Sequence, residues 1–282
     1  MDDEDAYRKY LANCERCFGL CCTALPYAKS ADFAVSKEGG IPCSNLQVDY
    51  RCRIHNNLRN SGYRGCTVYE CYGAGQKVSQ DTYNGKSWRD NPKLSREMFT
   101  VFPIMQQLYE MLYYLYEALR LQEAKPIYNE LQQAHNEIVR LTNQTPHALL
   151  ELNVQEHRMN VNTLLIQTSE LVREPCKYSA ERNKKRVLIT KRDMIGAKLR
   201  GADLMGADLR GVLLIAADLR EADMRMTDMI GADLRDTDLR KADLRGSIFL
   251  TQAQLNSANG DKHTQLPSHL KMPSHWRESL CK

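Results

Sequence analysis

Apolar residues recur at every fifth position through the last third of the chain. The series runs from Ile189 to Phe249, and a small or compact residue usually stands two positions before each apolar one. A period of five fits neither an α-helix nor a pleated strand, whose periods are 3.6 and 2. The pattern therefore predicts a repeat architecture built from five-residue units.

A different apolar spacing, alternating between three and four positions, marks the middle of the chain. It forms seams over residues 105–119, 127–141 and 161–172. This spacing predicts three helices in a small antiparallel bundle or a long hairpin. Pro126 can start the second helix, and Pro146 opens the turn before the third. The first helix carries four tyrosines that we expect in the core or in an interface: Tyr109, Tyr113, Tyr114 and Tyr116.

The beginning of the chain is distinguished by its cysteines. Eight of the ten cysteines fall between positions 14 and 71, namely Cys14, Cys17, Cys21, Cys22, Cys43, Cys52, Cys66 and Cys71. Two thiolates separated by two residues can reach one metal ion from a single turn. The side chains of the adjacent Cys21 and Cys22 tend to diverge. Eight thiolates with such a pair suit two metal centres, or one cluster with some cysteines outside the ligand set.

The five-residue units share the motif Ala-Asp-Leu-x-x, as in Gly201–Met205 and Lys241–Arg245. The motif resembles the pentapeptide-repeat family, which forms a right-handed, four-sided β-helix. The resemblance implies one pentapeptide per side and about three coils. Arg192 stands where a small residue is expected, so the first coil is expected to be a frayed or capped end.

The four sides of the implied β-helix differ in their outward residues. Two sides stack aspartates and arginines and are expected to be solvated charge ladders. The other two carry large apolar residues, which predicts surfaces covered by the upstream helices or by a second copy of the chain. The predicted interaction surface comprises Ile195, Leu213, Ile215, Ile230, Ile248 and Leu250, with Leu188 beside them.

The wider cysteine pattern continues with Pro42–Leu46, Arg51–His55 and the pair Cys66-x4-Cys71. It resembles the family described as CxxCxxCC putative zinc- or iron-chelating domains. The first spacing here is one residue longer, and His55 stands where that family often has tyrosine. The resemblance implies zinc or an iron–sulfur cluster on the eight cysteines, with His55 as a further candidate ligand.

Three interpretations of the cysteine region remain open: a structural metal, a redox or sensing cluster, and a disulfide framework. Cys176 and Cys281 receive no role. The glycine-containing segment 72–76 lacks a preceding strand and a phosphate-binding fingerprint, so it is predicted to be a turn.

The composition and charge of the chain indicate where the protein is expected to be found. The formal net charge is +4, no apolar stretch approaches the ~18 residues of a membrane span, and the acidic start is unlike a signal peptide. A soluble, cytoplasmic protein is expected, and in that reducing compartment clustered cysteines favour metal over disulfides. The expected parts are a cysteine-rich module (1–93), a helical bundle (94–175), a linker (176–186), the β-helix (187–251) and a C-terminal cap or tail (252–282). The end of that tail, residues 266–276, is expected to be extended and solvated, with Trp276 over the open end of the β-helix.

No catalytic or cofactor fingerprint is present, which favours a non-catalytic interaction protein with a metal-bound head. Its partner would be another protein or a second copy, with no nucleic acid and no membrane. An iron–sulfur redox or metal sensor, and an accessory part of a protein-modifying enzyme, are alternatives. A further alternative is a DNA mimic that protects gyrase. Residues 186–251 hold twelve bases and eleven acids, which argues against that mimicry.

Overall fold

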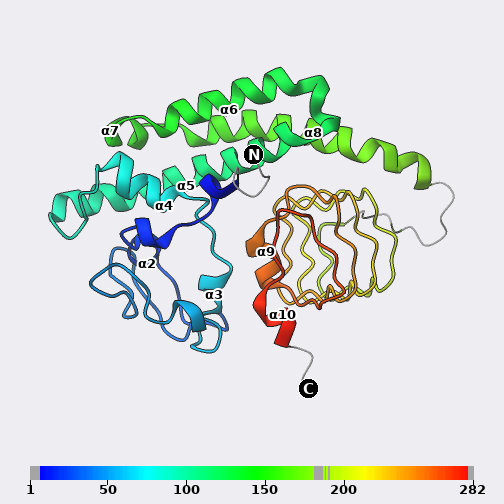
Figure 1. Cartoon of the computed structure of the whole chain (residues 1–282), viewed down its shortest axis with the longest axis horizontal. Coiled ribbons are helices and arrows are strands. Elements are labelled where there is room, and N and C mark those ends of the chain that lie inside the picture. The colour runs from blue at the N-terminus through cyan, green and yellow to red at the C-terminus, as the bar shows by residue number, and fades with distance from the viewer. Residues whose placement is uncertain (1–6, 181–186, 188, 190, 279–282) are drawn as a thin grey trace. The chain divides into compact units, whose positions relative to one another are not determined.

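The computed structural model describes residues 7–180, 187, 189 and 191–278, and the chain forms two compact units (Figure 1). The first unit comprises Met1–Leu119 and Ile127–Leu165, and the second comprises Arg120–Pro126 and Ile166–Lys282. Leu188, Cys281 and part of the expected linker (181–186) lie outside the described residues.

Long helices form in the middle of the chain, as its apolar spacing predicts. They are α5 (Pro92–Arg120), α6 (Tyr128–Thr142) and α8 (Val154–Ala180), with the short α7 (Pro146–Leu150) between the last two. Pro126 lies in a 3-10 turn, η5 (Gln122–Ile127), and Pro146 occupies the first turn of α7. Because α8 continues to Ala180, the first residues of the expected linker are helical.

Most positions of the predicted seams are buried, and Leu119, Ile127 and Ala134 are partly buried. On α5, Met105, Leu108 and Leu115 have no exposed surface, and on α8 Thr168 and Val172 are at most 2% exposed. The other buried seam residues are Leu112, Leu131, Ile138, Leu141, Val161 and Leu165. The helical prediction is therefore confirmed at the level of individual core positions.

The tyrosines of α5 are covered by the N-terminal part of the first unit. The rings of Tyr7 and Tyr116 meet edge-on with centroids 4.9 Å apart, and Tyr72 lies 5.2 Å from Tyr113. The amide of Gln106 also donates a hydrogen bond to the carbonyl of Glu70. The cysteine-rich segment thus packs on α5.

Short elements make up the cysteine-rich segment. They are η1 (Arg8–Tyr10), η2 (Cys14–Arg16), α2 (Leu20–Ala24), η3 (His55–Asn57), α3 (Arg64–Thr67), α4 (Ala74–Gln76) and the π-helix η4 (Lys77–Thr82). Isolated antiparallel bridges join Tyr27 to Lys37 and Leu46 to Cys52. The predicted turn at 72–76 is wrong for Ala74–Gln76, because the Ala74 and Lys77 N–H groups bond the carbonyls of Cys71 and Gly73 and begin a helix.

The five-residue units of the second unit form stacked coils, here called the solenoid (residues 187–265). Parallel bridges join Asp203 to Asp223 and Asp223 to Asp243, so one coil contains twenty residues, or four pentapeptides. The repeated apolar side chains point inward and are buried, with small residues beside them. The inward apolar residues from Leu199 on are Leu199, Leu204, Leu209, Leu214, Leu219, Met224, Met229, Leu234, Leu239, Leu244 and Phe249.

The stack of coils continues beyond the repeats. Asp238 bridges Asn259 and Asp243 bridges Gln265, with α9 (Gln252–Ser257) inserted between the coils. Trp276, on α10 (Ser274–Glu278), has no exposed surface, packs into the solenoid core and donates to the Ala258 carbonyl. The predicted solvated end at 266–276 is therefore wrong, because the last coil would otherwise expose its apolar interior.

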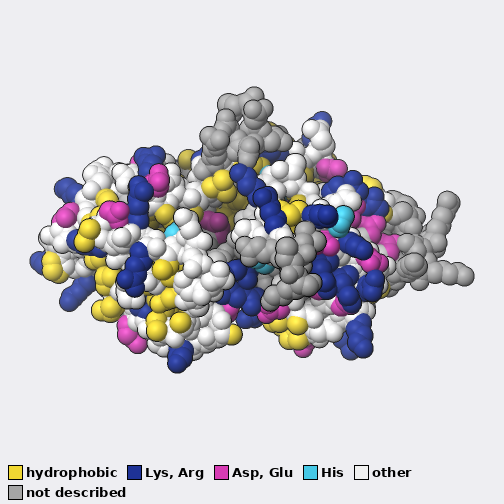
Figure 2. Space-filling model, turned by 60° about the horizontal axis from the view of Figure 1, so that its bottom comes forward, with side chains coloured by type: hydrophobic (Ala, Val, Ile, Leu, Met, Phe, Trp, Pro, Cys, Tyr) yellow, Lys and Arg dark blue, Asp and Glu magenta, His cyan; other side chains and the backbone are white. Residues whose placement is uncertain are grey.

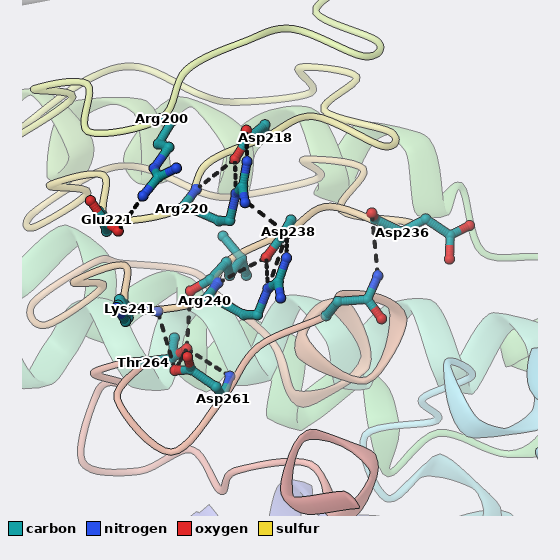
Figure 3. A network of polar contacts seen from close by, with 12 residues as sticks. Arg200, Asp218, Arg220, Glu221, Asp236, Asp238, Arg240, Lys241, Asp261 and Thr264 are labelled. Carbon is teal, nitrogen blue, oxygen red and sulfur yellow. Dashed lines mark hydrogen bonds and ion pairs between the residues drawn. The ribbon is translucent and has the colours of Figure 1, made fainter. Parts of the chain in front are cut away.

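Outward aspartates and arginines pair within their own repeats. Arg220 donates to both oxygens of Asp218 at 2.7 and 2.6 Å, and its Nε lies 3.7 Å from Asp238 of the next coil (Figure 3). Arg240 repeats this pairing with Asp238. The predicted charge ladders are thus locally neutral, and basic and acidic side chains intermix over the solenoid (Figure 2).

Candidate metal centre and interaction surface

All eight cysteines between positions 14 and 71 belong to the first unit. Short helical turns and loops hold them. We distinguish two sets by the segments that hold them, and the charges of Cys22 and Cys52 in the second set also act on Cys14 in the first. The first thiol set contains Cys14 and Cys17 at η2, Cys21 on α2 and Cys71 before α4. The second thiol set contains Cys22 on α2, Cys43 in a loop, Cys52 at a bridge and Cys66 on α3.

In the first thiol set, Cys17 and Cys71 face the backbone of Gly75. A Cβ at Gly75 would lie 2.7 Å from the Cys17 sulfur and 3.8 Å from the Cys71 sulfur. Burial raises the pKa of Cys17 to about 11. The Leu20 N–H, which donates to the sulfur, opposes this rise, and the charge of Cys71 adds to it. Burial, then the charges of Cys17 and Cys22, raise the pKa of Cys14 to about 11.

In the second thiol set, the Cys43 N–H bonds the Cys22 carbonyl at 2.9 Å, and the Tyr27 hydroxyl donates to the Cys43 sulfur at 3.3 Å. Burial, then the charges of Cys22 and Cys43, raise the pKa of Cys66 to about 12. Burial also raises the pKa of Cys52. The Ile54 N–H opposes this rise, and the charges of Cys22 and Cys43 add to it. The pKa values of Cys52 and Cys66 are therefore both raised further by the neighbouring thiols.

The two sets meet at Cys21 and Cys22, whose sulfurs lie 3.9 Å apart. Cys14, Cys52 and His55 also line one cavity of about 790 Å³, together with Leu11, Ala12, Asn13, Glu15, Arg51 and Asn56. His55 is exposed at this cavity.

A tetrahedral Zn–S distance of ~2.3 Å requires sulfurs roughly 3.8 Å apart. Among the described residues, no group of three or more His, Cys, Asp or Glu side chains is arranged to hold a metal ion. Metal binding would therefore draw the thiols of a set together.

The residues of the predicted interaction surface separate into two groups. Ile248 and Leu250 are buried and Ile230 is partly buried. Ile248 bridges Asp228, whose carboxylate bonds Ser169 of α8, and Leu250 belongs to the solenoid core. Ile195 and Leu213 are 53% and 38% exposed, and Ile215 is partly exposed.

The contacts of α8 come from one helix face. A Cβ at Gly206 would overlap the Cβ of Cys176, and the Cys176 thiol donates to the Met226 sulfur at 3.7 Å. Arg173, one turn earlier, approaches Asp208 at 3.9 Å.

Comparisons with known proteins agree with the fold. Eight copies of the family model described as pentapeptide repeats match residues 193–211 and 213–249. A protein of Bacillus subtilis (strain 168), "Uncharacterized protein YybG", is 63% identical over 266 residues, which cover 94% of each chain. The chain belongs to the YybG family. The pentapeptide-repeat prediction is thereby confirmed, whereas metal binding by the cysteine region of this YybG-family protein stays a prediction.

Sequence reasoning did not find three residues of the YybG-family site: Lys37, Tyr27 and Gly75. For Gly75 the sequence held a signal, namely the glycine-containing segment 72–76. That segment was interpreted only as a turn. Lys37 and Tyr27 had none, since the bridge that joins them, beside the hydrogen bond from Tyr27 to Cys43, has no local pattern. Across the described part of the chain, no helix is long and apolar enough to cross a membrane.

Proposed function

We propose that this YybG-family protein is a non-catalytic metal-binding protein whose solenoid presents a protein-binding surface. The metal would be zinc or an iron–sulfur cluster held by the cysteines of the first unit. The observation that carries the proposal is the convergence of eight thiols from separate segments of the chain into two groups within one unit. Such clustering is the usual arrangement around zinc and iron–sulfur centres.

The chemistry of the thiols supports a metal. Cysteine binds zinc or iron as the thiolate, so binding of one Zn²⁺ by four thiols releases four protons. Burial raises the pKa of Cys14, Cys17 and Cys66, and a bound cation would offset this by stabilising the thiolates. The cysteine-rich segment contains only short helices and isolated bridges, so metal binding would also contribute to its folding free energy.

Anaerobic purification followed by metal and sulfide analysis tests the proposal. A colourless protein with stoichiometric zinc would support a structural metal, and a brown protein with iron and acid-labile sulfide would support the redox alternative. Cys17→Ser is expected to reduce the metal content. Cys176→Ser is the matched control, because Cys176 lies in the second unit against Met226. A wild-type protein without zinc or iron would contradict the proposal.

The proposed protein-binding surface is the open side of the solenoid at Ile195, Leu213 and Ile215. Leu213 pairs with Asp193 of the preceding coil, and the Gly196 N–H bonds the Ile215 carbonyl, so these side chains stack on adjacent coils. Exposed apolar side chains grouped in this way favour association. A second copy of the chain is the first candidate occupant.

Sedimentation velocity over a concentration series tests self-association. The wild type should form a dimer, and the Ile195→Asp, Leu213→Asp double variant should remain monomeric. Lys198→Asp, an exposed position on the neighbouring side, serves as the charge-matched control. A wild type that stays monomeric throughout would contradict the homodimer.

The gyrase-protecting alternative receives little support from the solenoid. Its aspartates are neutralised by arginines two positions later, as in Asp218–Arg220 and Asp243–Arg245. DNA mimicry requires a continuous negative surface, so no protection of gyrase from a quinolone is expected in a supercoiling assay.

A further inference from the structure

We propose that Cys17 and Cys71 are a redox-active pair that closes to a disulfide when the protein equilibrates with a low-molecular-weight disulfide such as oxidised glutathione. Both cysteines are free thiols in the structure. The inference goes beyond the proposed metal binding, because the bond joins two residues of the chain and requires no metal ion. It assigns a redox modification site between the end of η2 and the start of α4.

The two sulfurs face the same glycine. A Cβ at Gly75 would lie 2.7 Å from the Cys17 sulfur and 3.8 Å from the Cys71 sulfur. The two sulfurs are therefore separated by no more than the sum of these distances, about 6.5 Å. Rotation about χ1 moves a cysteine sulfur from one staggered position to another, which is the movement that closing this gap requires. Gly75 has no side chain to obstruct it.

Hydrogen bonds hold the backbone on both sides of Cys17 against η4. Ser79 accepts a hydrogen bond from the Phe18 N–H at 3.0 Å, and the Gln80 side chain donates to the Arg16 carbonyl at 2.8 Å. Both partners belong to η4, which directly follows α4. These bonds fix the segment that carries Cys17 beside the helical segment that follows the second cysteine.

The short helix α4 is bonded to both cysteine-bearing segments. The Ala74 N–H donates to the Cys71 carbonyl at 2.9 Å. The Gln76 side chain accepts a hydrogen bond from the Asn13 N–H at 3.0 Å and donates one to the Leu11 carbonyl at 2.9 Å. A disulfide would thus join segments that are already adjacent in the reduced protein, so its formation requires movement of side chains rather than unfolding.

Burial favours a neutral bond at this position. Cys71 is 9% exposed, and Cys17 is partly exposed. Two thiolates at this separation would place like charges in a site largely removed from water, which is costly. The disulfide carries no charge and avoids this cost. Because Cys17 is the more exposed of the two, a small disulfide reaches it first.

The reaction is two successive thiol–disulfide exchanges. The Cys17 thiolate attacks one sulfur of oxidised glutathione, the S–S bond of glutathione breaks, and one glutathione leaves as its thiolate. The Cys71 thiolate then attacks the Cys17 sulfur of the mixed disulfide and displaces the second glutathione. The two protons of the cysteine thiols pass to the two glutathione thiolates. The cysteines lose two electrons, which reduce one oxidised glutathione to two glutathione molecules.

Two other cysteine pairs compete with this one. The sulfurs of Cys21 and Cys22 lie 3.9 Å apart, but adjacent Cα atoms are only about 3.8 Å apart, below the ~4.4–6.8 Å that disulfides span. Cys14 is exposed and lies three positions before Cys17. The Cys17 side chain, however, points at Gly75, where the other cysteine sulfur within contact range is that of Cys71.

Disulfide mapping on the full chain tests the assignment. Trypsin cleaves after Arg16, so Cys14 falls in peptide 10–16, Cys17 in peptide 17–29 and Cys71 in peptide 65–77. The reduced protein, both as purified and after treatment with a chelator, is equilibrated with glutathione buffers of increasing oxidation, alkylated and digested.

We expect peptides 17–29 and 65–77 to be linked at the least oxidising ratio that gives any disulfide. This product should be at least tenfold more abundant there than the link between 10–16 and 17–29. Its appearance in either sample supports the pair. The assignment would be overturned by a different first disulfide in both samples, or by none in either.

Variants identify the cysteines within the linked peptides. Cys71→Ser should abolish the link and leave Cys17 carrying one glutathione. Cys66→Ser is the matched control, because Cys66 lies in the same tryptic peptide as Cys71, and the link should persist. A link that survives Cys71→Ser and disappears in Cys66→Ser would assign the bond to the wrong cysteine and refute the pair.

Gly75→Ala tests the geometry while leaving all cysteines in place. The added Cβ would displace the Cys17 sulfur, which can rotate away as a thiol but not within a disulfide. Half-oxidation should therefore require at least a tenfold more oxidising glutathione ratio, about 30 mV for a two-electron couple. The helical circular-dichroism signal should be retained, because alanine has a higher helix propensity than glycine. An unchanged midpoint would contradict closure over Gly75.

The failures of this inference and of the proposed function are distinguishable, because disulfide mapping and metal analysis are separate measurements. A protein that contains zinc or iron but never links Cys17 to Cys71 would overturn the redox pair alone. A protein that forms the link but contains neither metal would support the pair and contradict the proposed metal binding.

Discussion

Asp228 is a buried carboxylate whose replacement by asparagine should stabilise the solenoid. The residue has no exposed surface and lies beneath α8. One oxygen accepts the Ile230 N–H at 3.0 Å, and the other lies 3.4 Å from Arg210 Nε without a hydrogen bond. Most other aspartates of the repeats have an arginine two positions later, but here that position is Ile230.

The magnitude follows from the pKa. Burial raises the pKa of Asp228 from 3.8 to about 6, although the Ser169 hydroxyl and the Ile230 N–H favour the charged form. Ionising Asp228 therefore costs the folded state about 3 kcal/mol. The folded state retains the proton between pH 3.8 and about 6, where the unfolded chain has lost it. Stability consequently falls by ~1.4 kcal/mol per pH unit across this window and is level above it.

Urea unfolding from pH 4 to pH 8 measures this effect. Trp88→Phe serves as the background, so that fluorescence reports on Trp276 in the second unit alone. Asp228→Asn should match its parent near pH 4 and exceed it by up to ~3 kcal/mol above pH 6. Asp208→Asn is the matched control with the opposite sign, because the Arg210 hydrogen bonds lower the pKa of Asp208 to about 2. Equal stability of Asp228→Asn and its parent at pH 7.5 would refute the reasoning.

Three further predictions concern packing. Gly206→Ala and Gly211→Ala impose similar left-handed backbone strain, at φ 67° and 60°, but only the first meets Cys176 of α8. Gly206→Ala should therefore lose ~1–3 kcal/mol more in urea unfolding, and equal losses would contradict the docking of α8. Trp276→Ala should cost the solenoid ~3–5 kcal/mol by calorimetry, since it removes a fully buried side chain; a loss below ~1 kcal/mol would argue against its capping role. Gly75→Ala should lower the Zn²⁺ content by crowding the Cys17 and Cys71 sulfurs, with solenoid unfolding unchanged as the internal control; an unchanged Zn²⁺ content would refute this expectation.

Some parts of the site could be predicted from local patterns, and others could not. The cysteines stood out because thiols at short spacings are rare outside metal sites. The thiols that influence one another were not predictable, since Cys21 and Cys22 interact electrostatically with Cys71 and Cys66, which are distant in the sequence. The solvated end at 266–276 was mispredicted because its composition is polar and proline-containing, whereas the expected position of Trp276 at the end of the β-helix agrees with its burial in the solenoid core.

The amino-acid sequence by itself determined the solenoid and its register. Each side of a narrow coil accepts one large and one small residue inward, so a period of five specifies which residues face the core. It likewise determined the helical seams, because helix geometry places every third and fourth residue on one face. The tertiary structure decided that Ile248 and Leu250 are buried, that Ile195 and Leu213 stay exposed, and that Cys176 of α8 packs on Gly206 and Met226. These contacts join residues distant in the chain, and the local periodicity of a sequence carries no information about which distant surfaces will meet.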